Sequence, residues 1–142
     1  MRYMIFVKAN KDTEAGRFPP EPELSKLFGA MAAYHEELTK AGVLLDGSGL
    51  QPSSKGFRVN YSGGKTTVVD GPFAEAKELV AGYTLIQVKS RDEALEWARR
   101  FPNPAGEGKE AQIEVRLLYE LDDFAPSEGL ERFREMERDK QR

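Results

Sequence analysis

The chain has 142 residues, a length that fits one domain. Hydrophobic residues make up 39% and charged residues 32% of the sequence, which is typical of a globular protein and too apolar for disorder along most of the chain. The 21 basic and 24 acidic side chains give a net charge of -3. This charge argues against nucleic acid as a partner, because nucleic-acid binding normally needs a basic face.

The chain contains no cysteine and one histidine. The lack of cysteine excludes disulfide bonds, thiolate metal ligands and a cysteine nucleophile, and it makes the reducing cytoplasm the expected location. The single histidine disfavours a zinc site. The apolar run at the start of the chain is too short for a signal peptide or a membrane span, so we expect a cytoplasmic protein that does not bind membranes.

The first forty residues predict a strand, a loop and a long helix. Residues 3–9 are rich in aromatic and β-branched types and lack polar alternation, as in a strand buried on both faces. Residues 10–21 mix charges, glycine and two prolines, which indicates a surface loop. The helix is expected to begin at Pro22 and to stop at Ala41-Gly42, with one apolar stripe facing a sheet: Leu24, Leu27, Phe28, Met31 and Leu38.

The middle of the chain predicts a short strand and a hairpin. Residues 43–45 favour a strand that runs into a glycine-rich bend, where Gly47 and Gly49 would let backbone approach a neighbour or a ligand closely. Residues 56–61 and 65–69 flank Ser62-Gly63-Gly64 and predict a β-hairpin.

The remaining elements complete a recognisable order. Residues 80–88 predict a strand, and Ser90 with Glu93 forms a capping-box pattern for a helix that reaches Arg100. Residues 111–119 predict the last strand. The order is therefore β-α-β-(hairpin)-β-α-β, which indicates an α+β, ferredoxin-like βαββαβ subunit with an inserted hairpin.

Such a subunit carries its helices on one face of an antiparallel sheet. The other face stays apolar until something covers it, and a second copy of the chain is the simplest cover. We therefore expect a homodimer.

The end of the chain is charged and is expected to lie outside this domain. We place the domain at residues 1–124 and a C-terminal extension at residues 125–142. Leu130, Phe133 and Met136 repeat at helical spacing, so the extension is either a helix lying across the domain or its partner, or a frayed solvated tail.

One segment carries a family resemblance. Residues 70–78 read DGPFAEAKE, with Gly82-Tyr83 shortly after, and closely resemble the DGPF signature of YCII-related proteins. The segments AGVLL at 41–45, QP at 51–52, GK at 64–65 and IEVR at 113–116 also resemble that family, in the expected order. The resemblance covers roughly residues 1–124. It implies a dimeric α/β barrel built from two ferredoxin-like subunits, and it implies no cofactor.

Asp70 has two interpretations. It would end a strand, Gly71 would permit a sharp turn, and Pro72 would suit the first position of a short helix with free amides. As a structural cap of those amides, Asp70 would contribute about 0.5–2 kcal/mol, and Asp70→Ala would remove that stability. The alternative is a direct role in ligand binding or catalysis.

The rest of the motif adds candidate ligand-binding residues: Phe73, Glu75, Lys77 and Glu78. On a helix Glu75 and Glu78 would share one side, where two carboxylates beside Asp70 could bind a hard cation or divide acid and base roles. The alternative is that they are solvated acidic residues, which are favoured in the first turn of a helix. We expect no metal site.

His35 lies in the apolar stripe of the long helix, four residues after Met31 and three before Leu38. An imidazole facing a sheet needs a hydrogen-bond partner, and it is the best general acid or base that the chain offers. The alternative is a histidine that is simply paired in the core. The resemblance implies a His–Asp pair in the site, for which His35 and Asp70 are the candidates. Arg116, on the last strand, either binds an anion or pairs with a carboxylate at the surface.

Two functions follow. The first is a small-molecule enzyme or binding domain, with a pocket between sheet and helices near His35, Asp70, Gly47 and Gly49, and with proton transfer without a cofactor as its chemistry. The second follows from the resemblance, because some members of the family look associated with extracytoplasmic-function sigma factors. In that case the chain is a non-catalytic accessory protein, a sigma factor is its partner, and the DGPF segment is a structural turn.

Overall fold

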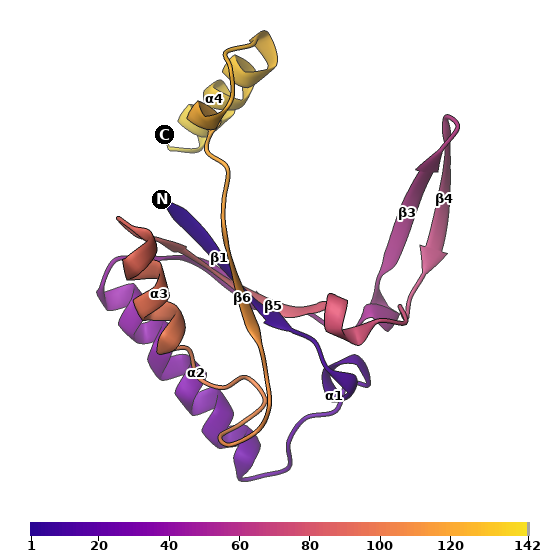
Figure 1. The fold of residues 1–142 in the computed structure, drawn as a ribbon, viewed down its shortest axis with the longest axis vertical. Coiled ribbons are helices and arrows are strands. Elements are labelled where there is room, and N and C mark those ends of the chain that lie inside the picture. The colour runs from indigo at the N-terminus through magenta and orange to yellow at the C-terminus, as the bar shows by residue number, and fades with distance from the viewer. Residues whose placement is uncertain (142) are drawn as a thin grey trace.

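The computed structural model describes residues 1–141, which form a mixed α+β fold with antiparallel sheets (Figure 1). The main sheet has the strand order β2-β5-β1-β6, and each neighbouring pair is antiparallel. This order and the chain connectivity confirm the ferredoxin-like subunit with an inserted hairpin. The strands of this sheet are β1 (Arg2–Lys8), β2 (Leu44–Gly49), β5 (Val80–Gln87) and β6 (Ile113–Leu117).

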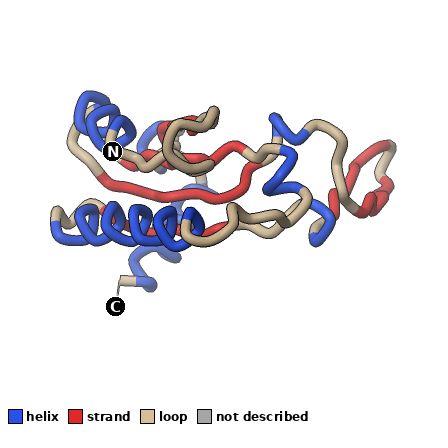
Figure 2. The backbone as a smooth tube through the Cα atoms, turned by 90° about the horizontal axis from the view of Figure 1, so that it is seen from below, coloured by secondary structure: helices blue, strands red, loops and turns tan. Residues whose placement is uncertain are grey.

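Two helices pack on one face of this sheet, and Figure 2 shows the longer one running alongside the strands. They are α2 (Glu23–Lys40) and α3 (Arg91–Arg99). Ser90 caps α3 as the sequence predicts, because its side chain accepts a hydrogen bond from the Glu93 amide. The helices bury one side of the central strands β1 and β5, and the core consists of Tyr3, Ile5, Tyr34, Leu38, Val43, Ile86, Val88, Ala94 and Trp97.

The strand β2 corrects one expectation. The predicted bend at Gly47 and Gly49 is wrong, because β2 runs through both glycines and pairs with β5 as far as Gly49 opposite Gly82. The irregularity lies earlier, where Leu45 is an extra residue between the paired Leu44 and Asp46. Pairing with a central strand offsets the poor strand propensity of glycine here.

The DGPF segment corrects a second expectation. Pro72 does not begin a helix: the segment is irregular after β4 and includes only the short 3-10 turn η2 (Ala76–Glu78). The amides after Asp70 have other partners, because Gly71 donates to the Gly56 carbonyl at 3.0 Å and Phe73 donates to the Ser53 hydroxyl at 3.0 Å. The expectation that Asp70 caps these amides is therefore wrong.

The other helices and strands are the short helix α1 (Lys11–Glu14), the hairpin strands β3 (Phe57–Ser62) and β4 (Lys65–Asp70), and the C-terminal helix α4 (Glu128–Lys140). Figure 1 shows the hairpin and α4 standing apart from the body that the sheet forms with α2 and α3. Two short 3-10 turns also occur, η1 (Ser53–Lys55) and η3 (Leu121–Asp123). At the end of the chain, residues 128–140 form a helix, and Ser127 caps it by accepting from the Leu130 amide. Its packing across the domain or a partner stays a prediction.

Candidate functional site

A cavity of about 700 Å³ lies between the first half of α2 and the sheet. The loop after α1 and residues 101–110 form its sides. Its apolar lining comes mainly from Val7, Phe18, Pro19, Pro20, Leu24, Leu27, Phe28, Met31, Phe101, Pro104 and Ala105. A concave, largely apolar site of this size is typical of small-molecule sites.

The floor of the cavity is formed by β2 and β5, and glycines make up part of it. Gly49 lies opposite Gly82, and Gly47 lies opposite Thr84, on the side of the sheet that faces α2. A Cβ atom at Gly49 would meet nothing within 4 Å, so this position opens onto the cavity. A Cβ at Gly47 would stand 3.5 Å from Nε2 of His35, and a Cβ at Gly82 would stand 3.1 Å from the Ser48 carbonyl oxygen.

His35 lines the cavity with both ring nitrogens already paired. Its Nδ1 lies 2.8 Å from the Met31 carbonyl oxygen, one turn earlier in α2, so Nδ1 must be the donor. Its Nε2 lies 2.9 Å from the Thr84 hydroxyl, and in the neutral ring Nε2 accepts from that hydroxyl. Thr84 is buried, with 2% of its surface exposed. The geometry is that of a histidine satisfied within the fold.

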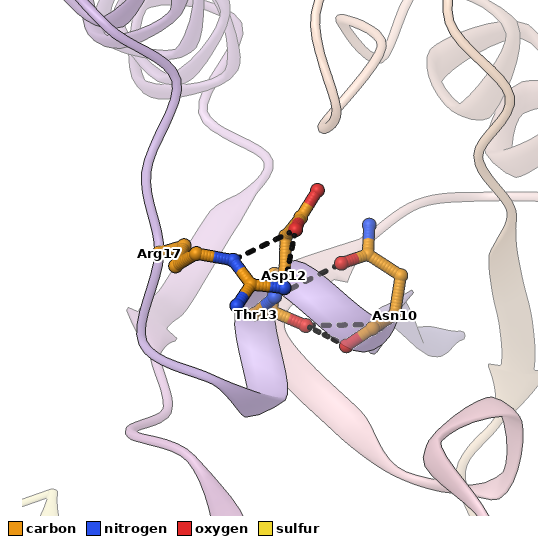
Figure 3. A network of polar contacts seen from close by, with 4 residues as sticks. All are labelled: Asn10, Asp12, Thr13 and Arg17. Atoms are coloured by element: carbon orange, nitrogen blue, oxygen red, sulfur yellow. Dashed lines mark hydrogen bonds and ion pairs between the residues drawn. The ribbon is translucent and has the colours of Figure 1, made fainter.

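Polar side chains form one wall, and Figure 3 shows them from close by. Asn10 caps α1. Its side-chain Oδ1 accepts from the Thr13 backbone amide at 2.9 Å, and the Asn10 backbone amide donates to the Thr13 hydroxyl at 2.8 Å. Arg17 donates twice to one oxygen of Asp12, at 3.1 and 3.0 Å. All four residues line the cavity.

Sequence reasoning missed this wall. The segment 10–21 was expected to be a loop throughout, and the Asn-x-x-Thr pattern of Asn10 and Thr13 was the local signal for the short helix. Asp12 and Arg17 are exposed charges with ordinary spacing, and Thr84 looks like any strand residue. Only the tertiary fold brings them to the cavity that His35 lines.

Of the residues predicted from the sequence, His35, Gly47 and Gly49 do come together at the cavity. The described part of the chain does not place Asp70, Phe73, Glu75, Lys77 or Glu78 among the lining residues. Asp70 lies at the end of the hairpin opposite Phe57, and the His35 ring is bonded to Met31 and Thr84 instead. Within one chain the expected His35–Asp70 pair is therefore not formed.

The other predicted site residues have different surroundings. Phe73 packs under the Arg58 guanidinium, whose central carbon is 3.7 Å from the ring centre. Arg116 pairs across the strands with Met4, so it points away from α2 and the cavity. It forms an exposed ion pair with Glu114 at 3.3 Å, which is the surface-pairing alternative.

Two tyrosines near the site have perturbed acidity. Burial raises the pKa of Tyr34 to about 12, and its hydroxyl donates to the Trp97 carbonyl at 2.8 Å. The hydrogen bond from the Tyr83 hydroxyl to Asp46, at 2.8 Å, raises the pKa of Tyr83.

Residues 1–141 contain no group of three or more His, Cys, Asp or Glu side chains placed to hold a metal ion. Among the helices in that range, none combines the length and the apolar character needed to cross a membrane.

Comparisons with known proteins place this geometry in context. The model of one family, described as the YCII-related domain, matches residues 1–118. An uncharacterized protein of Rhizobium meliloti (strain 1021) is 34% identical over 97 residues, which cover 68% of this chain and 78% of that protein. Among solved structures, the chain is similar to 5-chloro-2-hydroxyhydroquinone dehydrochlorinase from Burkholderia phenoliruptrix AC1100 in complex with 2,5-dihydroxybenzoquinone, with a TM-score of 0.41 and 13% identity over 84% of this chain and 94% of that chain.

Proposed function

The chain belongs to the YCII-related domain family, and we propose that it binds a small, flat and largely apolar molecule between α2 and the sheet. The observation that carries this proposal is the cavity of about 700 Å³ with apolar walls and a glycine floor. Burial of an apolar ligand in such a site contributes roughly 25 cal/mol for each Å² removed from water.

The shape of the ligand follows from the floor and the roof. Gly49 leaves the backbone of β2 open to the cavity and the His35 ring lies over Gly47, while Leu24 and Met31 of α2 line the side of the cavity opposite the sheet. A planar ring can lie on bare peptide planes and be covered by aliphatic side chains, whereas a bulky globular group cannot reach the floor as closely.

The wall supplies groups that would orient a polar substituent of the ligand. Arg17 and Lys109 both line the cavity. Arg17 uses Nε and one terminal nitrogen on Asp12, which leaves its other terminal nitrogen for a ligand. Among residues 1–141 Lys109 takes part in no ion pair. Both cations can donate to an oxygen of the ligand.

Proton transfer by His35 is a second candidate function, favoured by the position of its ring at the cavity beside Gly47. Both ring nitrogens are engaged, so a proton would have to pass through the Thr84 hydroxyl, or the Nε2 contact to Thr84 would have to break. Ligand binding needs no such rearrangement, and for this reason we place binding before catalysis. No observation on residues 1–141 favours the sigma-factor alternative.

We also propose the homodimer as the assembly. Alternate residues of β1 and β5 point away from α2 and α3, and they include Met4, Phe6 and Leu85. A second copy would cover this half-buried apolar face.

The ligand proposal is tested at Gly49, where added atoms enter the cavity without touching protein. Naphthoate serves as the flat probe, adamantane carboxylate as the bulky probe of equal charge, and ligand-observed NMR as the measurement. Wild type should bind naphthoate more tightly than adamantane carboxylate. Gly49→Ala should weaken naphthoate binding, and Gly49→Val should abolish it. The control Gly129→Ala, on α4, should bind like wild type.

Two results would contradict the proposal. Unchanged naphthoate binding by Gly49→Val would remove the cavity as the site, provided that its melting temperature matches that of wild type. Tighter binding of adamantane carboxylate than of naphthoate would remove the preference for a flat ligand.

A further inference from the structure

Three segments that are far apart in the sequence meet at Ser53. Both carboxylate oxygens of Glu14, the last residue of α1, accept from it: Oε1 from the Ser53 amide at 3.0 Å and Oε2 from the Ser53 hydroxyl. The same hydroxyl oxygen accepts from the Phe73 amide, in the DGPF segment, at 3.0 Å. All of these bonds are partly buried, so they are less exchanged with water than surface contacts are.

The DGPF turn closes tightly on Ser53. Gly71 donates to the Gly56 carbonyl at 3.0 Å, and Gly56 donates to the Ser53 carbonyl at 2.9 Å. A Cβ atom at Gly71 would overlap the Ser53 carbonyl oxygen and stand 2.6 Å from its carbon. The motif therefore fixes the backbone of residues 53–56 by direct contact.

The other end of this tie reaches the ligand cavity. Asn10, Asp12, Thr13 and Arg17 line it, and they belong to the same short segment as Glu14. The hydrogen bonds among these four residues stay within the segment, as Figure 3 shows. They shape the wall but do not attach it to the remainder of the fold. The Glu14 carboxylate, by contrast, joins the wall to η1 and through Ser53 to the motif.

We infer that Glu14 is a positioning residue of the cavity, and that the DGPF turn acts on the ligand site through Ser53 and Glu14. This inference rests on the proposed ligand binding. It gives the motif a role although its own side chains from Asp70 to Glu78 lie away from the cavity wall. Loss of the tie frees the wall, and ligand affinity falls because the wall must then be ordered when the ligand binds.

The test uses Glu14→Ala and Ser53→Ala, with Glu14→Gln as the conservative variant and Glu96→Ala on α3 as the matched control. Hydrogen exchange should quicken at the amides of Glu14, Ala15, Gly16 and Arg17, whose bonds close the α1 segment, while exchange in α2 stays as in wild type. Naphthoate affinity should fall roughly threefold to tenfold, as for the loss of one or two net hydrogen bonds. Glu14→Gln should recover part of it, because its amide oxygen can still accept from Ser53.

The outcomes separate this inference from the proposed function. If Glu14→Ala left either the hydrogen exchange of the α1 segment or the naphthoate affinity unchanged, while Gly49→Val still abolished binding, the inference would be overturned. The proposed ligand site would not be affected by that result. Faster exchange spread evenly over α2 and the sheet would also overturn it, because it would show general destabilisation. A wild-type chain that does not bind naphthoate, or Gly49→Val that binds it normally, would remove the ligand site and the inference together.

Discussion

Only glycine fits at position 71, because every other residue type has a Cβ atom and there is no space for one. A Cβ atom there would overlap the backbone of Ser53, which cannot rotate away as a side chain can. We predict that Gly71→Ala lowers the free energy of unfolding by about 1–3 kcal/mol or more, as forcing extra atoms into packed space does. Chemical denaturation followed by circular dichroism measures this change.

The matched control for that variant is Gly29→Ala, in α2, where a Cβ atom would meet nothing within 4 Å. Alanine is the better helix former, so this variant should gain about 0.5–1 kcal/mol. If the two glycine variants changed stability by similar amounts and in the same direction, the contact between Gly71 and Ser53 would not be the reason.

Asp70 is expected to contribute little to stability. Its carboxylate makes no hydrogen bond or ion pair with any residue in the range 1–141, and its neighbouring amides are satisfied by Gly56 and Ser53. We predict that Asp70→Ala stays within about 0.5 kcal/mol of wild type, as exposed substitutions usually do. A melting curve that shows a loss of more than 1 kcal/mol would restore the capping role that the sequence suggested.

Tyr34 joins α2 to α3, and it makes the packing of these two helices sensitive to high pH. Burial raises the pKa of Tyr34 to about 12 in the folded chain, against about 10 for an unfolded tyrosine. Because the folded state holds this proton more tightly, the contribution is complete below about pH 10 and is lost as pH rises toward 12. The loss is at most about 2–3 kcal/mol.

Tyr34→Phe isolates that contribution. It removes the hydroxyl and its hydrogen bond to the Trp97 carbonyl, so it should cost about 1 kcal/mol at pH 7. Between pH 10 and pH 12 its unfolding free energy should fall less steeply than that of wild type. Parallel curves for the two chains over that range would contradict the role of Tyr34.

At the level of elements, local patterns predicted the two long helices and most strands, and they did not predict features that depend on distant contacts. The short helix α1 was also missed, although Asn10 and Thr13 give a local signal for it. The spacing of neighbouring residues predicted α2 and the Ser90 cap of α3. It predicted the apolar stripe of α2 only in part, because Leu38 is buried but Phe28 is 60% exposed. The continuation of β2 through Gly49 depends on pairing with β5, and the irregular course after Asp70 depends on the Ser53 hydroxyl reaching the Phe73 amide. Neither β5 nor Ser53 is close in sequence to the segment that it contacts, so local patterns could not predict these contacts.

The same division applies to the candidate site. His35 and the two glycines of β2 were found because helical spacing and a glycine-rich strand are visible in the sequence. The His35 partner Thr84 was not found, because Thr84 is 49 residues away along the chain. Glu14 gave no signal either, because its role depends on Ser53, which is 39 residues away.

The whole molecule has one covered and one open sheet face. Ile5 and Ile86 are fully buried toward α2 and α3, whereas Met4 and Leu85, a cross-strand pair, point the other way and are only half-buried. The hairpin adds exposed apolar side chains of its own: Phe57, Val59, Tyr61 and Val68. Apolar surface of this kind on a monomer marks an interaction site.

The proposed homodimer makes the open face the place to test. A lysine at Leu85 would bring a charge into the middle of the interface. Its cross-strand partners are Met4 and Asp46, and the Asp46 carboxylate already accepts a hydrogen bond from the Tyr83 hydroxyl. Leu85→Lys should therefore be monomeric at micromolar concentration, while wild type has twice the mass of the chain in sedimentation equilibrium. The control is Leu95→Lys, on the outer side of α3, where 38% of the leucine is exposed; this variant should remain dimeric. A wild-type chain that sediments as a stable monomer, or Leu85→Lys that sediments as a dimer, would show that a second copy does not cover this face.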